Sequence, residues 1–135
     1  MGKPTGFLEF RRQNRTSLPV SDRIENYREF IQPLPEPTKL GFTERQGWVA
    51  YQLKNYLFVK RFGFIEGDIY PDGGVNFETY TCDQFLEVES LGPMTDLAPG
   101  KTVKHIEIWD LFRDVPTIRT EADADRELGK RIRRL

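Results

Sequence analysis

The feature that most constrains this chain is a series of short segments in residues 41–112 in which apolar and polar side chains alternate. Leu86 and Val88, for example, alternate with Glu87 and Glu89. A two-residue period places alternate side chains on opposite faces of a β-strand, so that one face is buried and the other meets water. Ten Phe, five Tyr and two Trp add to the strand preference. The pattern therefore predicts a mainly β fold.

Turn-forming residues separate these segments. We expect a hairpin that joins residues 47–53 to residues 56–62, with Asn55 taking a positive φ angle in the turn. The sequence of residues 97–101, which contains Pro and Gly, predicts a second turn that leads into a long strand over residues 102–112. Most of the predicted sheet is thus built from neighbouring segments.

The two ends of the chain have a different character. Five of the nine prolines fall in the first 37 residues, which predicts an extended arm containing a short helix over residues 21–30. From Thr120 onward the period becomes helical. The apolar stripe of this helix consists of Leu128, Ile132 and Leu135. We therefore divide the chain into a leader arm (1–38), a β domain (39–118) and a C-terminal helix (119–135).

Composition excludes several functions. A net charge of −1 provides no field that would attract nucleic acid or an anionic membrane. Cys82 is the single cysteine, so no internal disulfide and no cysteine cluster for zinc or iron–sulfur is expected, and no metal or other cofactor is predicted. No apolar run has the length of about 20 residues that spans a bilayer. With no secretion signal at the N-terminus, we expect a cytoplasmic protein.

A resemblance to a known superfamily extends over roughly residues 39–120. The matching motifs are Arg45-Gln46-Gly47-Trp48, residues 56–62, residues 70–81, residues 85–93 and Leu97-Ala98-Pro99-Gly100. In this order they resemble the closing part of a galactose-mutarotase-like domain of the aldose 1-epimerase superfamily, in an uncharacterised bacterial branch. The resemblance implies a partial β-supersandwich, here with an extended or helical N-terminal arm and a C-terminal helix.

A second resemblance covers residues 1–36. Residues 1–10, 23–30 and 33–35 are similar to the N-terminal leader of the glutamate synthase small subunit. In that family iron–sulfur cysteine clusters follow the leader, and flavin and NADPH domains come after them. This sequence continues differently, since its only cysteine is Cys82.

The superfamily's epimerases use a carboxylate base and a histidine acid to open the sugar ring. In the family the base precedes a turn of the Leu-x-Pro-Gly kind, and the resemblance therefore implies that Glu89 is the catalytic base, with Glu78 as second choice. Glu87 shares the face of Glu89 and is a candidate for substrate binding. The competing interpretation is that Glu87 and Glu89 only mark the solvated face of an edge strand.

The partner acid and the sugar-stacking residues are less well defined. The family's histidine lies in an earlier part of the domain, and His105, on one face with Glu107 and Trp109, is the only histidine present. We assign His105, Trp48 and Tyr80 to substrate binding, with Tyr70 and Trp109 as further aromatic candidates. Aromatic side chains at strand spacing are also typical of a core.

Three functions follow as hypotheses. The first is a truncated carbohydrate-binding domain with a sugar as its partner and without efficient catalysis. The second is a small aldose 1-epimerase-like isomerase that works as an oligomer. The third is an accessory protein related to the glutamate synthase small subunit, whose leader docks on that enzyme. Because a partial sandwich leaves strand edges unpaired, self-association through those edges is also expected.

Overall fold

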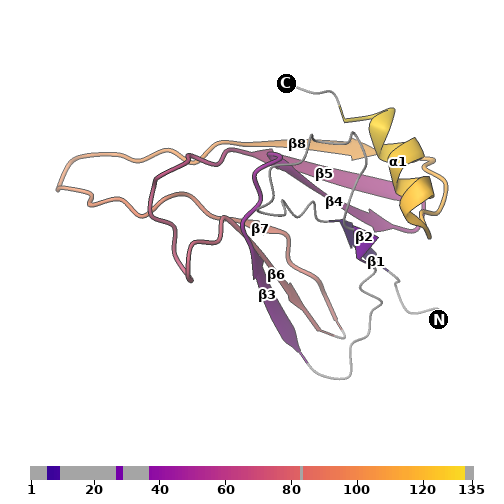
Figure 1. The fold of residues 1–135 in the computed structure, drawn as a ribbon, viewed down its shortest axis with the longest axis horizontal. Helices are drawn as coiled ribbons and strands as arrows, with labels where there is room; N and C mark the ends of the chain where they lie inside the picture. Colours follow the sequence, from indigo (N-terminus) through magenta and orange to yellow (C-terminus); the bar gives the residue numbers. More distant parts are fainter. Residues whose placement is uncertain (1–5, 10–26, 29–36, 83, 133–135) are drawn as a thin grey trace.

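The computed structural model describes residues 6–9, 27–28, 37–82 and 84–132, and for the first two of these ranges only the backbone. The chain is mainly β, with two antiparallel sheets and one C-terminal helix (Figure 1). The predicted helix over residues 21–30 is wrong at Tyr27–Arg28, where the backbone pairs with residues 8 and 9 as a strand. The rest of that segment lies outside the described residues.

The sheets are assembled from the following strands. The five-stranded sheet has the order β2 (Tyr27–Arg28), β1 (Gly6–Glu9), β4 (Trp48–Leu53), β5 (Tyr56–Phe62) and β8 (Glu107–Phe112). The three-stranded sheet has the order β3 (Thr38–Phe42), β6 (Phe77–Thr81) and β7 (Glu89–Ser90). The helix α1 spans Glu121–Gly129. Since β1 pairs with β4, the leader arm contributes strand backbone to the larger sheet.

The predicted hairpin is confirmed as the β4–β5 pair, in which Leu53 lies opposite Tyr56. The positive φ angle falls on Lys54, at 56°, and not on Asn55 as we expected. The Asn55 side chain instead donates a hydrogen bond from Nδ2 to Asp114 Oδ1 at 3.2 Å. Asn55 therefore anchors the hairpin to the segment that leads from β8 to the helix.

The later strands are shorter than the sequence predicts. The alternation of Leu86 and Val88 with Glu87 and Glu89 predicts one strand over residues 85–90, but only β7 pairs with β6, and Leu86 forms an isolated bridge with Thr81. The strand expected over 102–112 is paired only from Glu107, where β8 lies along β5. Within the described part of the chain, no strand lies beside residues 102–106. The predicted turn before them is present, with Lys101 N donating to Ala98 O at 3.0 Å.

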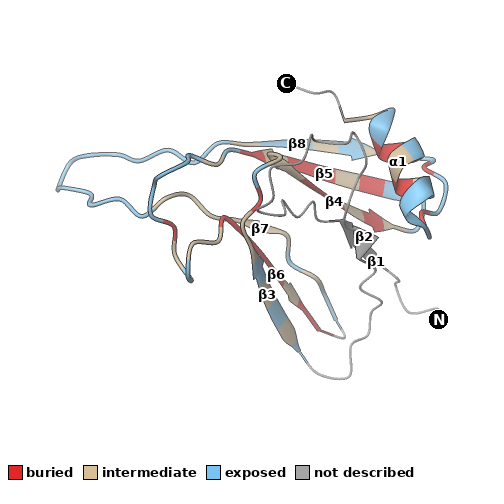
Figure 2. Ribbon diagram, viewed as in Figure 1, coloured by how far each residue is buried: buried red, intermediate tan, exposed pale blue. Residues whose placement is uncertain are grey.

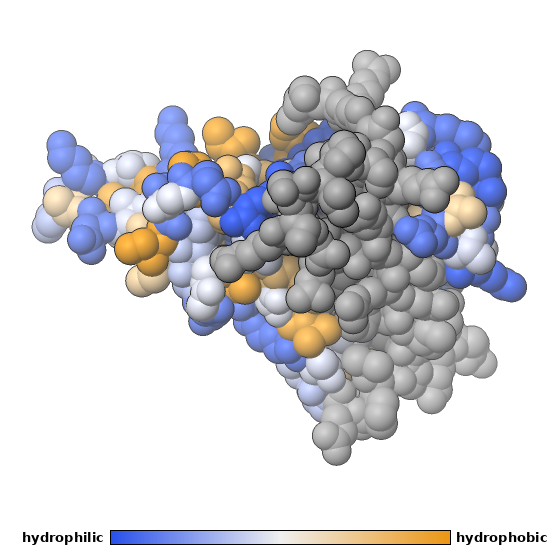
Figure 3. Space-filling view, in the orientation of Figure 1, coloured by the Kyte–Doolittle hydropathy of each residue, from blue (hydrophilic) through white to orange (hydrophobic). Residues whose placement is uncertain are grey.

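Two apolar cores lie on opposite faces of the β4–β5 hairpin. On one face the helix-side core brings α1 against the sheet, and on the other the inter-sheet core joins the two sheets (Figure 2). The helix-side core consists of Ala50, Leu57, Val59, Val115, Ile118, Ala124 and Leu128. The inter-sheet core consists of Val49, Phe62 and Phe77, with Phe42, Tyr51 and Val88 packed against it. Outside these cores, hydrophobic groups lie among hydrophilic ones over the end from which the β7–β8 loop projects (Figure 3).

The helix begins where the sequence predicts. Thr120 is the N-cap, and its Oγ1 accepts a hydrogen bond from Asp123 N at 3.1 Å while Thr120 N donates to Asp123 Oδ2 at 3.2 Å. This reciprocal capping box satisfies donors that the first turn leaves without helical partners. Leu128 is buried, as the apolar stripe predicts. The helix ends at Gly129, before the predicted stripe residue Ile132, which still packs against the helix-side core, and Leu135 lies outside the described residues. No helix in the described part of the chain has the length and apolarity required to cross a membrane.

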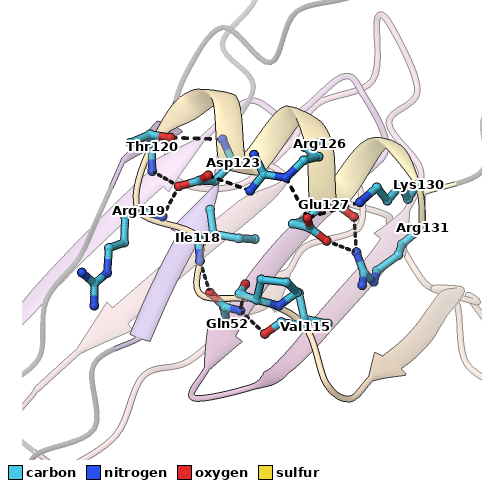
Figure 4. A network of polar contacts seen from close by, with 11 residues as sticks. Gln52, Val115, Ile118, Arg119, Thr120, Asp123, Arg126, Glu127, Lys130 and Arg131 are labelled. Carbon is cyan, nitrogen blue, oxygen red and sulfur yellow. Dashed lines mark hydrogen bonds and ion pairs between the residues drawn. The ribbon is translucent and has the colours of Figure 1, made fainter.

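A buried glutamine holds the helix connection against the sheet (Figure 4). Gln52 Nε2 donates to Pro116 O at 2.9 Å, and Gln52 Oε1 accepts from Ile118 N at 2.8 Å. The Gln52 side chain thus replaces the strand partner that this irregular segment lacks. Buried backbone groups are costly when left without hydrogen bonds.

Replacing this glutamine by an apolar residue is expected to destabilise the fold. Gln52→Leu should lower the free energy of unfolding by about 2–4 kcal/mol, because the buried Ile118 N–H and the part-buried Pro116 carbonyl lose their partner. Chemical denaturation followed by circular dichroism measures the change. Gln84→Leu, at an exposed position, is the control and should shift stability by less than about 0.5 kcal/mol. Equal effects of the two variants would contradict the structural role of Gln52.

A second polar cluster forms around Glu127 at the C-terminal end of α1 (Figure 4). Glu127 is buried, and Arg131 Nη1 donates to its Oε2 at 2.8 Å while Arg126 Nε donates to its Oε1 at 2.9 Å. Lys130 Nζ lies 3.3 Å from Oε1. The hydrogen bonds from Arg131 and then Arg126 lower the pKa of Glu127 from 4.5 to about 2. The basic end of the helix is thus organised by one carboxylate.

This pKa shift predicts how stability depends on pH. Because the pKa of Glu127 is lower in the folded state, its stabilising contribution is complete above pH 4.5 and is lost as the pH falls toward 2. Glu127→Gln should melt at a lower temperature at pH 7 and lose less of its melting temperature between pH 4.5 and pH 2 than the parent chain. Thermal melts across that range test this. Glu121→Gln, exposed in the first turn, should keep the parent's pH dependence.

Candidate functional site

The carboxylates singled out in the sequence meet on the outer face of the three-stranded sheet. Glu78 in β6 lies directly opposite Glu89 in β7, so both side chains emerge on the same face. Glu87 precedes Glu89 by two residues and shares this face, and Lys39 in β3 reaches it from the other side of β6. We call Lys39, Glu78, Glu87 and Glu89 the carboxylate face. Sequence reasoning named its three acids but missed Lys39, although Lys39 alternates with Leu40 as an outward residue should.

Lys39 links the two strands that carry the acids. Its Nζ lies 2.6 Å from Glu78 Oε2 and 3.6 Å from Glu89 Oε2. The Glu78 side chain is only 6% exposed, whereas half of the Lys39 side chain meets solvent. The hydrogen bond to Glu78 raises the pKa of Lys39, so the ammonium stays charged. The Glu78 carboxylate is therefore held in a contact with Lys39 that is nearly buried on the glutamate side.

On the carboxylate face, Glu89 has a pKa above its ordinary value. A hydrogen bond with the Glu87 side chain raises the pKa of Glu89, and burial raises it further, while Lys39 lowers it. The raised pKa makes Glu89 easier to protonate than an ordinary carboxylate. Its oxygens can accept hydrogen bonds from a neutral polyol, and a carboxyl group with a raised pKa suits general acid–base chemistry.

Aromatic rings border the carboxylate face. Tyr80 lies opposite Lys39 in the β3–β6 ladder, and its ring centroid is 5.7 Å from that of Phe85. Glu87 N donates to Tyr80 O at 2.8 Å, which ties the segment carrying Glu87 to β6. About half of Phe85 is exposed. The predicted residue Tyr80 thus does lie beside the predicted acids, and Phe85 is an aromatic neighbour that the sequence did not single out.

His105 lies on the opposite side of β7. Successive residues of a strand face opposite ways, and Ser90, next to Glu89, contacts His105 through Oγ and Nε2 at 2.8 Å. The Ser90 hydroxyl also donates to Glu107 Oε1. Because that hydroxyl has a single proton, His105 Nε2 is the donor in the remaining contact. His105 and Glu89 therefore do not share a face, contrary to what a base–acid pair at one sugar requires.

Glu107 organises the polar cluster around His105. It accepts hydrogen bonds from Lys60 Nζ at 3.0 Å and from Trp109 Nε1 at 2.8 Å, besides that from Ser90. Burial raises the pKa of Glu107, but these three donors outweigh it and hold the pKa below its ordinary value. Ser, His and Glu meet here, yet the carboxylate contacts the serine and not His105 Nδ1. The arrangement lacks the base–orienter bond of an acyl-transfer triad.

The remaining aromatic candidates are dispersed. Trp48 packs against the helix-side core, on the far face of the five-stranded sheet, because its position in β4 alternates with inter-sheet Val49. Tyr70 is buried, stacked on Phe64 at 5.0 Å, and its hydroxyl accepts from Ile65 N at 2.9 Å. Trp109 remains largely exposed. The structure thus places Trp48 in a packing role, away from the carboxylate face.

Comparisons with protein-family models, with curated proteins and with solved structures gave no match. Among the residues that the structure describes, no group of three or more His, Cys, Asp or Glu is arranged to hold a metal ion. The carboxylate face and its two aromatic neighbours are therefore interpreted from their own geometry.

Replacing Glu87 and replacing Lys39 should shift the pKa of Glu89 in opposite directions. Glu87→Gln should lower the pKa of Glu89, since it removes a neighbour that raises it, and Lys39→Met should raise that pKa further. Carboxyl carbon shifts followed by NMR across pH give the values. Glu66→Gln, a change in an exposed carboxylate paired with Arg45, is the control and should leave Glu89 unaffected. Shifts of one sign in both variants would contradict the assigned contacts.

Proposed function

We propose that this chain is a carbohydrate-binding domain of the galactose-mutarotase-like kind, a partial supersandwich that binds sugars weakly and lacks efficient turnover. The proposal is supported by one observation above all: acids from β6 and β7, a lysine from β3 and the Tyr80–Phe85 ring pair border one another on a single sheet face. The resemblance of residues 39–120 to the closing part of a mutarotase-like domain points to the same ligand class.

The chemistry of this face suits a pyranose. Carboxylate oxygens accept hydrogen bonds from sugar hydroxyls, and the exposed part of the Lys39 ammonium can donate to a hydroxyl oxygen. The C–H face of a sugar is apolar enough to pack on an aromatic ring, which Phe85 offers at the edge of the acids. About half of Lys39 and of Phe85 is exposed. The surface of a sheet buries less of a ligand than a deep cleft does, so weak binding is expected.

Efficient epimerisation is not expected, because ring opening needs a base and an acid at the same sugar. Glu89 is the proposed base, but His105 lies across β7 from it and is engaged with Ser90. A missing general acid costs a factor of about 10²–10⁴ in rate. A small aldose epimerase is the second candidate, and the raised pKa of Glu89 beside Glu87 favours it, because general acid–base catalysis works best with a carboxyl group whose pKa lies closer to neutrality.

Sugar binding is tested by titrating aldoses into the isotope-labelled chain and recording backbone amide shifts. We expect saturable shifts at Lys39, residues 78–80 and residues 85–89, with dissociation constants on the order of 1–50 mM. Glu89→Gln should weaken binding several-fold, and the control Glu66→Gln should not. If the amides of this face do not respond to any aldose, the proposal fails.

Polarimetry on freshly dissolved aldose separates binding from catalysis. The binding proposal predicts that the chain leaves the rate of mutarotation close to that in buffer. A clear acceleration that is abolished in Glu89→Gln would replace the proposal with the epimerase alternative.

A further inference from the structure

The strand β8 forms one edge of the five-stranded sheet. Its inner edge pairs with β5 over Glu107–Phe112, and among the described residues no strand pairs with its outer edge. The backbone N–H and C=O groups of an edge strand are a template for adding another strand. This edge therefore offers a docking surface, and its side chains indicate which partner fits it.

The two acids of β8 do not protect this edge. Glu107 Oε1 lies 3.0 Å from Lys60 Nζ, and Asp110 Oδ2 lies 2.5 Å from Arg61 Nη1, so each acid has a basic partner within its own sheet. Charged residues discourage edge pairing when their charge is unbalanced at the edge. Part of β8 is exposed (Figure 2). Its exposed apolar side chains include Trp109, at 66%, and Leu111, at 70%.

The segment just before β8 continues the strand pattern without pairing. The sequence predicts a strand over residues 102–112, yet only Glu107–Phe112 is paired. Val103 and Ile106 are exposed, and so is Lys104 between them. Val103 and Ile106 fall on opposite faces of the expected strand, and residues 103–106 have no neighbouring strand in the described part of the chain.

We propose that two copies of the chain pair antiparallel along this edge, about a two-fold axis at Glu107, to join their five-stranded sheets. Residues directly opposite in an antiparallel pair have numbers with a constant sum and share a face. An axis at Glu107 therefore sets Val103 opposite Leu111 and Ile106 opposite Ile108. These pairs cover four exposed apolar side chains of each copy and extend the strand over residues 103–111.

Charge complementarity selects this alignment. It sets the exposed Lys104 of each copy opposite Asp110 of the other, so that each Asp110, which contacts Arg61 of its own chain through Oδ2, gains a second basic neighbour. An axis at Ile108 would instead place Lys104 opposite Phe112 and Ile106 opposite Asp110. This alignment has one unfavourable contact, because it places Glu107 of one copy opposite Glu107 of the other. Lys60 in each chain offsets that negative charge.

Sedimentation velocity over a range of concentrations tests the dimer. The full chain should sediment as a monomer–dimer equilibrium, and Lys104→Glu should raise the dissociation constant about tenfold, because two attractive pairs become repulsive. Lys101→Glu makes the same charge change outside the paired residues and should leave association unchanged. A chain that stays monomeric at its highest soluble concentration overturns the proposal, as do equal effects of the two variants.

Disulfide cross-linking tests the alignment independently. A mixture of Val103→Cys and Leu111→Cys chains should form the mixed disulfide dimer under mild oxidation, while either variant alone should link far less. Both positions are exposed, so the variants are expected to fold, and Cys82 is buried. A dimer that gives no preference for the mixed product has another alignment, and the proposal is then wrong.

Discussion

The structure depends on the β4–β5 hairpin, because both of its faces are buried. Ala50, Leu57 and Val59 point toward α1, and Val49 and Phe62 point toward the three-stranded sheet. Few small sheets bury both faces, and those that do need a covering layer on each. Here the helix supplies one layer and the smaller sheet supplies the other. Phe77, which is fully buried and 6.0 Å from Phe62 by ring centroids, joins the two sheets.

Buried charges connect these layers at the end that carries the candidate site. Lys60, on the inter-sheet face of β5, donates from Nζ to Val88 O at 2.6 Å and to Glu107 Oε1 at 3.0 Å. It thereby fixes the segment before β7 against β5 and β8. The strand that carries Glu89 on its outer face is thus positioned by a lysine on its inner face. Replacing one partner of such a pair is costly, because the other charge remains buried.

Sequence patterns a few residues long predicted the structural features that are set by contacts between residues close in sequence. The β4–β5 hairpin, the outward position of Glu87 and Glu89 and the capping of α1 by Thr120 all follow from alternation or helix signals within a few residues. The exact turn residue did not, because Lys54 and Asn55 can both adopt positive φ, and the side-chain bond of Asn55 to Asp114 is a contact over 59 positions. Tyr27–Arg28 were likewise misassigned, since a strand of two residues exists only through its partner.

The sequence by itself determined a mainly β chain with a capped C-terminal helix, and it placed Glu87 and Glu89 on the side of their segment opposite Leu86 and Val88. Only the tertiary structure decided that Glu78 and Glu89 meet at Lys39, that Trp48 belongs to the helix-side core, and that His105 lies across β7 from Glu89. The reason is that alternation fixes which residues share a face within one strand. The burial of Phe62, Phe77 and their neighbours between the sheets sets which strands lie side by side. These contacts join residues far apart in sequence, so the alternation within one strand cannot predict them.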